Sequence, residues 1–171
     1  MGRPRLSGPR RRHLTGLRPV RPGDGPACFA VFHAAVHRGA RAAYSAEERA
    51  AWAPSTAPPA DWEARLLAGT TLIAERFGHV LSFMTLGPDG YLDLAYVAPD
   101  VMGQGVGRLL HDRVLDAARS ANLSLLSTEA SLVARPVFAH LGWRETARQS
   151  VIRHGVALTN FRMELSLAAA P

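Results

Sequence analysis

The sequence of 171 residues contains one cysteine and no lysine. With Cys28 as the only thiol, the chain can form no internal disulfide and offers no cysteine-based metal site. The absence of lysine excludes Schiff-base catalysis and the nucleotide-binding P-loop, which both use that side chain. Cys28 falls in step with Val31 and Ala35 on a predicted helix face, so we interpret it as a buried core residue; a nucleophilic thiol is the alternative. This cysteine usage is typical of a reduced, cytoplasmic protein.

Acidic residues are absent from the first 21 positions, which contain seven of the 20 arginines. The rest of the sequence contains 13 arginines and 14 acidic residues, so the positive formal charge of +6 comes from the N-terminal segment. We predict that residues 1–13 form a disordered basic tail, because they offer too few apolar side chains to bury. A nucleic-acid-binding protein is a hypothesis that rests on this tail alone, and such binding would be nonspecific.

Long apolar runs are also missing, so the sequence predicts neither a secretory signal nor a membrane-spanning helix, and no membrane partner. A hydrophobic content of 47% and a charged content of 20% are ordinary for a globular domain. We therefore predict one domain over residues 14–167, followed by a disordered C-terminus at 168–171.

Within that domain, hydrophobic periodicity predicts strand, helices, three strands, helix, strand, helix and two strands, in that order. Ser45 and Glu48 form a capping box for one short helix. Asp24 is expected to cap the first helix, which runs to about His37, and Asp61 to cap another. The order of elements indicates an α+β fold, with a mostly antiparallel sheet of about six to seven strands flanked by helices.

Three glycines stand at every second position where the helix after the fourth strand is expected to begin. They lie in "VAPDVMGQGVGRLL", residues 97–110, as Gly103, Gly105 and Gly107. The free N–H groups at a helix start and the helix dipole favour an anion, and missing side chains let a pyrophosphate approach the backbone. The dinucleotide fingerprint fails because Arg108 stands where its third glycine belongs. A loop that needs glycine only for turning is the alternative.

This segment resembles the acetyl-CoA signature of the GNAT (GCN5-related) N-acetyltransferases, in which a strand ending in V-x-P precedes an R/Q-x-x-G-x-G/A loop that opens a helix. The resemblance extends over most of residues 14–167, and the stretches "AYSAEERAAW" and "EASLVARPVFAHLGWRE" are similar to those of small bacterial members. It implies the GNAT fold, with a sheet that splays apart at an acetyl-CoA cleft. It also implies a set of cofactor-binding residues: Tyr96, Val97, Met102, Gly103, Gln104, Gly105, Val106, Gly107, Arg108 and Phe138.

Two positions depart from the family pattern. Met102 occupies the place of the usual Arg or Gln, so one charge-assisted contact to the pyrophosphate is expected to be missing. Phe138 stands where many members carry the tyrosine thought to protonate the departing CoA thiolate. These departures support a rival hypothesis, in which the chain is a CoA-binding regulatory module with little or no turnover.

Asp93 lies in the middle of the apolar strand "YLDLAYVAP" and is a candidate general base. An amine must lose a proton before it attacks a thioester, and a carboxylate can accept that proton. A period of two puts Asp93 on the face of Ala95 and Val97. Leu92 and Leu94 are then expected to share the opposite face. The position also matches the family's glutamate base, and pairing of Asp93 with an arginine is the structural alternative.

Glu129, on the neighbouring strand, is a second candidate base or amine-binding anion, and a solvated strand end is its alternative. Tyr44 precedes a helix in the segment that lids the acceptor site in this family, which suggests a substitute acid or a substrate contact; packing is the alternative. His154 and Asn160 flank the last hairpin and are candidate substrate contacts. His33 and His37 lack a third ligand, so we predict no metal site.

These observations predict an enzyme that transfers an acetyl group from acetyl-CoA to a primary amine by direct attack in a ternary complex. The resemblance implies a backbone N–H near Val97 as donor to the developing negative charge, and a possible homodimer. Small-molecule amines and protein amines present the same ammonium group, so the sequence does not identify the acceptor.

Overall fold

The computed structural model describes residues 14–167, in which seven strands form one sheet with the order β1-β2-β3-β4-β5-β7-β6. Neighbouring strands are antiparallel, except that β4 and β5 are parallel. The predicted tails at 1–13 and 168–171 lie outside the described residues. The strands are β1 (Gly16–Pro19), β2 (Thr70–Arg76), β3 (His79–Leu86), β4 (Tyr91–Val97), β5 (Leu125–Ser131), β6 (Arg144–Arg153) and β7 (Val156–Ser166). The predicted mostly antiparallel α+β fold is confirmed.

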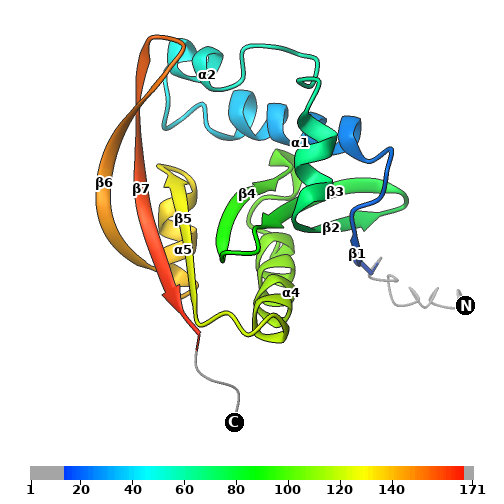
Figure 1. Cartoon of the computed structure of the whole chain (residues 1–171). Helices are drawn as coiled ribbons and strands as arrows, with labels where there is room; N and C mark the ends of the chain where they lie inside the picture. Colours follow the sequence, from blue (N-terminus) through cyan, green and yellow to red (C-terminus); the bar gives the residue numbers. More distant parts are fainter. Residues whose placement is uncertain (1–13, 168–171) are drawn as a thin grey trace, which may run out of the picture.

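Helices cover both faces of this sheet (Figure 1). They are α1 (Gly25–Ala34), a π-helical turn η1 (Ala35–Gly39), α2 (Ala46–Trp52), α3 (Trp62–Ala68), a 3₁₀ turn η2 (Pro99–Val101), α4 (Val106–Ser120) and α5 (Ala134–His140). The amphipathic α4 buries Leu110 and Val114 against one face, in the larger core. On the other face, α1 and α3 bury Phe29 and Leu66 against Phe83 of β3.

The sheet splits between β4 and β5. Only two residue pairs join these strands, Tyr91 with Ser127 and Leu92 with Thr128. The buried Thr128 hydroxyl donates to the Leu92 carbonyl at 2.8 Å and closes the joined end. Beyond that point the two strands diverge, as Figure 1 shows. The split leaves an opening inside the sheet, as the resemblance implied.

A β-bulge in β4 changes the facing of its side chains. Leu92 pairs with Leu86 and Leu94 with Thr85, so Asp93 is an extra residue on β4. Leu92 consequently packs in the α4-side core with Ala95, whereas Leu94 packs in the α1-side core. The prediction that Leu92 and Leu94 share a face was therefore wrong, because strict alternation fails at a bulge.

The predicted helix caps differ in outcome. The capping box is present, since the Ser45 hydroxyl accepts from the Glu48 N–H at 3.1 Å and the Ser45 N–H donates to Glu48 at 2.7 Å. Asp24 and Asp61 stand at N-cap positions but make no capping bond. Asp24 instead accepts two bonds from the Arg18 guanidinium, at 2.7 and 2.9 Å. Asp24 therefore binds Arg18 and does not cap α1. The spacing of residues in the sequence could not reveal this pairing.

Candidate active site

The glycine stretch lies between η2 and α4, and its glycines serve two different purposes. Gly103 and Gly105 adopt positive φ angles of 75° and 83°, with open space around them, so glycine is favoured there by backbone conformation. A Cβ on Gly107 would lie 3.1 Å from Cγ2 of Val97, so this glycine lets α4 approach β4 closely. The loop therefore turns sharply and ends against the open edge of β4.

The start of α4 offers free backbone donors. Within residues 14–167, the N–H groups of Val106, Gly107 and Arg108 donate to no backbone carbonyl. Gln104 turns back, and its side-chain amide donates to the Asp100 carbonyl at 3.0 Å. Arg108 is exposed on the first turn of α4. Free backbone donors and the positive end of the helix dipole are the features that the predicted binding of a phosphate requires.

Met102 and Phe138 both make apolar contacts. A Cβ on Gly39 would lie 2.8 Å from the Met102 terminal methyl carbon, so Met102 lies against the π-helical turn. Phe138 is buried in the larger core, with its ring centroid 5.0 Å from that of Trp143 and 6.4 Å from that of His111. Neither side chain brings a charge or an acid to the opening.

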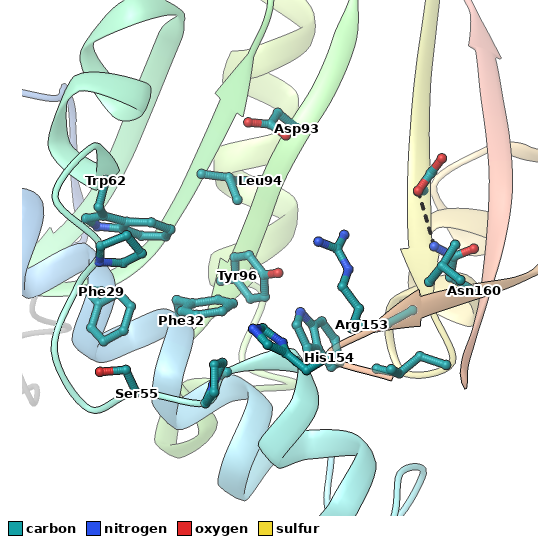
Figure 2. A pocket seen from close by; sticks show the side chains of 18 of the residues that line it. Phe29, Phe32, Ser55, Trp62, Asp93, Leu94, Tyr96, Arg153, His154 and Asn160 are labelled. Carbon is teal, nitrogen blue, oxygen red and sulfur yellow. Dashed lines mark hydrogen bonds between the residues drawn. The ribbon is translucent and has the colours of Figure 1, made fainter. Parts of the chain in front are cut away.

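On the α1 side of the opening lies a cleft of about 400 Å³. That size is ordinary for a site that binds a small molecule. Its position between β4 and the β6–β7 hairpin is seen in Figure 2. Five rings that contact one another form an aromatic wall of this cleft: Phe29, Phe32, Trp52, Trp62 and Tyr96. Tyr91 also lines the cleft. Tyr96 belonged to the predicted cofactor set, but its side chain lines this cleft.

Asp93 and Glu129 both line the cleft, each as the first residue beyond the last β4–β5 pair. The Asp93 carboxylate accepts two bonds from the Arg65 guanidinium, at 2.6 and 2.7 Å. One oxygen of Glu129 accepts from the Asn160 side-chain amide at 3.3 Å. The structure thus brings both predicted carboxylates to the apex of the split, one bound to an arginine and one held only by a neutral amide.

Two arginines that line the cleft were not predicted from the sequence. Arg65 comes from α3 and Arg153 from the end of β6, and both line the cleft with Asp93 and Glu129. Burial raises the pKa of Tyr91, and the carboxylates of Glu129 and Asp93 raise it further while the two guanidinium groups oppose them. Only tertiary structure brings these charges together, so no local spacing could have found the arginines.

Tyr44, just before α2, bonds to β7 and to the residue that follows β5. Its buried hydroxyl donates to the Thr159 carbonyl at 2.6 Å and accepts from the Leu132 N–H at 2.9 Å. Burial raises the pKa of this phenol, with the Leu132 N–H acting in the opposite direction. The Tyr44 proton is therefore already engaged by a carbonyl, an arrangement that favours the packing alternative over an acid.

His154 and His37 each contact a backbone carbonyl at the C-terminal end of α2. His154, at the β6–β7 turn, lies 2.9 Å from the Ala51 carbonyl through Nδ1, and His37 lies 2.8 Å from the Ala53 carbonyl through Nε2. The rings of His33 and His37 lie 4.3 Å apart by their centroids. No group of three or more potential metal ligands occurs within the described part of the chain.

Cys28 is fully buried, and burial raises the pKa of its thiol to about 12. A thiol in that state is a poor nucleophile, so an acyl-enzyme on Cys28 is disfavoured. Among residues 14–167, no helix is long and apolar enough to cross a membrane.

Comparison with known proteins identifies the class to which this site belongs. The model of the GNAT acetyltransferase domain matches residues 40–165. The uncharacterized N-acetyltransferase YafP of Escherichia coli K12 is 27% identical over 147 residues, which cover 86% of this chain and 93% of YafP. The chain therefore belongs to the GNAT acetyltransferase family.

Solved structures agree with this assignment. A GCN5-related N-acetyltransferase from Rhodopseudomonas palustris is 35% identical, with a TM-score of 0.84 over 90% of this chain and 96% of that one. The acetyltransferase yncA from Salmonella typhimurium, solved with its cofactor acetyl-CoA, is 23% identical, with a TM-score of 0.63 over 92% of this chain and 98% of that one. At that lower identity the likeness is one of fold. The protein is an N-acetyltransferase of the GNAT family.

Proposed function

We propose that this protein transfers the acetyl group of acetyl-CoA to the primary amine of a small molecule bound in the cleft. The observation that carries the proposal is the arrangement of the split sheet. The free N–H groups of Val106, Gly107 and Arg108, which we propose as an anion cradle, follow the end of β4. Two carboxylates lie at the apex of the split, in a cleft with the volume of a small-molecule site. Family membership and the acetyl-CoA bound by yncA support the choice of cofactor.

The residues of the cradle fit the pyrophosphate of a CoA molecule. The N–H groups of Val106, Gly107 and Arg108 would hold its oxygens, and the side-chain-free surface of Gly103 and Gly105 leaves the backbone accessible. When bound, acetyl-CoA supplies an acetyl group on a thioester that an unprotonated amine can attack. These backbone donors compensate in part for the arginine or glutamine that Met102 replaces.

Glu129 is the better placed of the two candidate bases. Both oxygens of Asp93 accept from Arg65, whereas Glu129 accepts one bond from the neutral amide of Asn160. Glu129 therefore binds the ammonium group of the acceptor and takes one proton from its nitrogen. Asp93 fixes the position of Arg65. As the C–N bond forms and the thioester C–S bond breaks, the nitrogen loses a second proton, and CoA leaves as the thiol that carries this proton.

The open edge of β4 supplies a donor for the acetyl oxygen. The N–H of Ala98 donates to Leu81 in β3, at 2.7 Å. Alternation along the strand then directs the N–H of Val97 to the opposite edge, where β5 has diverged. That N–H is available to stabilise negative charge on the carbonyl oxygen as the amine attacks.

A CoA-binding module without turnover is the second candidate, favoured by the apolar contacts of Met102 and Phe138. Two measurements separate the candidates. Acetyl-CoA at one hundred times its Kd is expected to stabilise the fold by about 2.7 kcal/mol, or roughly 5–11 °C in Tm, whereas ATP and NAD leave Tm unchanged. Failure of acetyl-CoA to raise Tm would contradict both candidates.

Turnover is then measured as thiol release with a panel of primary amines. Glu129→Gln is expected to lower kcat/KM about a hundredfold or more, the usual contribution of a general base. Asp116→Asn, on the exposed face of α4, is the matched control. Acetyl-CoA binding without thiol release for any amine would favour the module, and an unchanged rate in Glu129→Gln would remove Glu129 from the mechanism.

A further inference from the structure

The charges that line the cleft are balanced, with two carboxylates and two guanidinium groups. Arg65 and Asp93 neutralise each other through two hydrogen bonds of 2.6 and 2.7 Å. That pair occupies both oxygens of Asp93 and leaves Glu129 and Arg153 as the charges available to a bound molecule. A cleft that selects a polyamine is instead expected to carry an excess of negative charge.

Arg153 makes no hydrogen bond or ion pair with any other residue in the range 14–167. Figure 2 shows its guanidinium pointing into the cleft, between Tyr96 and Asn160. The side chain of the next residue, His154, contacts α2, with Nδ1 2.9 Å from the carbonyl oxygen of Ala51. Arg153 is thus an exposed cation that points into the cleft and has no anionic partner among residues 14–167, and a planar carboxylate could accept two bonds from it.

Glu129 supplies the opposite charge across the same cleft. Glu129 is exposed, and its only hydrogen bond from a described residue comes from Asn160, a neutral donor, so no cation within residues 14–167 pairs with its carboxylate. An unpaired anion and an unpaired cation that face one cavity match a ligand with one charge of each sign. The α-ammonium and α-carboxylate of an amino acid are such a pair.

The third feature is the aromatic wall. The rings of Phe32 and Tyr96 lie 4.9 Å apart by their centroids in an edge-on arrangement, and those of Phe32 and Trp62 lie 5.4 Å apart. All three line the cleft. Such a surface gains most by covering an apolar or aromatic side chain, because water leaves both surfaces on binding.

We infer that the acceptor is a free amino acid with a large apolar or aromatic side chain, whose ammonium group binds Glu129, whose carboxylate binds Arg153 and whose side chain lies on the aromatic wall. This inference rests on the proposed acetyl transfer, and it adds the class of acceptor. A peptide N-terminus has an amide in place of the carboxylate and would leave Arg153 unpaired, so it is disfavoured.

The test compares matched ligands: phenylalanine and tryptophan, their amides, and the decarboxylated phenethylamine and tryptamine, with alanine as the small amino acid. Binding is measured as a Tm shift in the presence of CoA, and transfer as thiol release with acetyl-CoA. We expect kcat/KM for phenylalanine or tryptophan to exceed that of its amide, its decarboxylated form and alanine by about tenfold or more. Arg153→Gln should remove about that factor, mainly through KM, and leave the decarboxylated amines within about twofold.

Arg148→Gln is the control, because Arg148 is exposed on the same strand and lies over the ring of Phe161, outside the cleft. Partial recovery in Arg153→Lys would support a carboxylate contact. Equal use of the amides or amines, or an equal loss for both ligand types in Arg153→Gln, would overturn the inference. If acetyl-CoA raises Tm but no amino acid binds or reacts, the acceptor class is wrong and CoA binding stands. If acetyl-CoA has no effect, the proposed function fails and the inference falls with it.

Discussion

Tyr44→Phe tests whether Tyr44 is a structural brace or a catalytic acid. The change removes only the hydroxyl, which is buried and makes two hydrogen bonds, at 2.6 Å to the Thr159 carbonyl and at 2.9 Å from the Leu132 N–H. Each partner left unpaired in a buried place costs about 1–3 kcal/mol. We therefore expect a loss of about 3 kcal/mol in the free energy of unfolding, and a fall in Tm of roughly 6–12 °C for a domain of this size.

Thermal unfolding measures this loss, and amide hydrogen exchange at Leu132 locates it. Tyr91→Phe is the matched control, because Tyr91 lines the same cleft and its hydroxyl makes no hydrogen bond within residues 14–167. That variant should stay within about 1 kcal/mol of the parent. If Tyr44→Phe left Tm within about 2 °C of the parent and lowered kcat by a hundredfold or more, the phenol would be an acid and the reasoning from its two bonds would be refuted.

Three further predictions concern the loop and the buried histidine. Met102→Arg should lower the Kd for CoA about tenfold by restoring a charge-assisted contact, as titration calorimetry would show; no change would place position 102 away from the pyrophosphate. Gly105→Ala should lose about 1–2 kcal/mol of stability in thermal unfolding, because its φ of 83° is left-handed, and an unchanged Tm would contradict that strain. Burial lowers the pKa of His111, so the unfolded chain binds more protons and stability should fall as pH drops below about 6.5. In His111→Gln, whose amide oxygen can still accept from Trp143, this part of the fall in Tm between pH 7.5 and 5 should disappear; an unchanged profile would exclude His111.

The elements and the sharp turn of the glycine loop could be predicted because their signals are local. The glycines at 103, 105 and 107 stand within five residues, and backbone dihedrals and a close approach account for them. The capping box of Ser45 and Glu48 likewise depends on residues three apart. In such patterns, the residues that satisfy a physical requirement are neighbours in the sequence, so the sequence alone reveals them.

Features that depend on distant partners were missed. The hydroxyl of Tyr44 reaches residues 88 and 115 positions away, so no spacing could reveal that its proton is engaged. Asp93 was expected to follow the alternation of its strand, but the partner strand β3 is one residue shorter at that place. Asp24 stands at a position typical of a helix cap, but its carboxylate accepts two hydrogen bonds from Arg18. In each case the missing information was the identity of a neighbour in space.

The split sheet has a consequence for how the width of the cleft is determined. The strands β4 and β5 are joined at two residue pairs and through the Thr128 hydroxyl. The larger core runs beneath both strands and includes Leu92, Leu126 and Phe161. Hydrogen bonds prescribe direction, whereas apolar contacts do not. The angle between the two halves is therefore set by the volumes of buried side chains. A change of one methylene in this core can widen or narrow the cleft, and the range of acceptors can shift without any substitution on the surface that touches them.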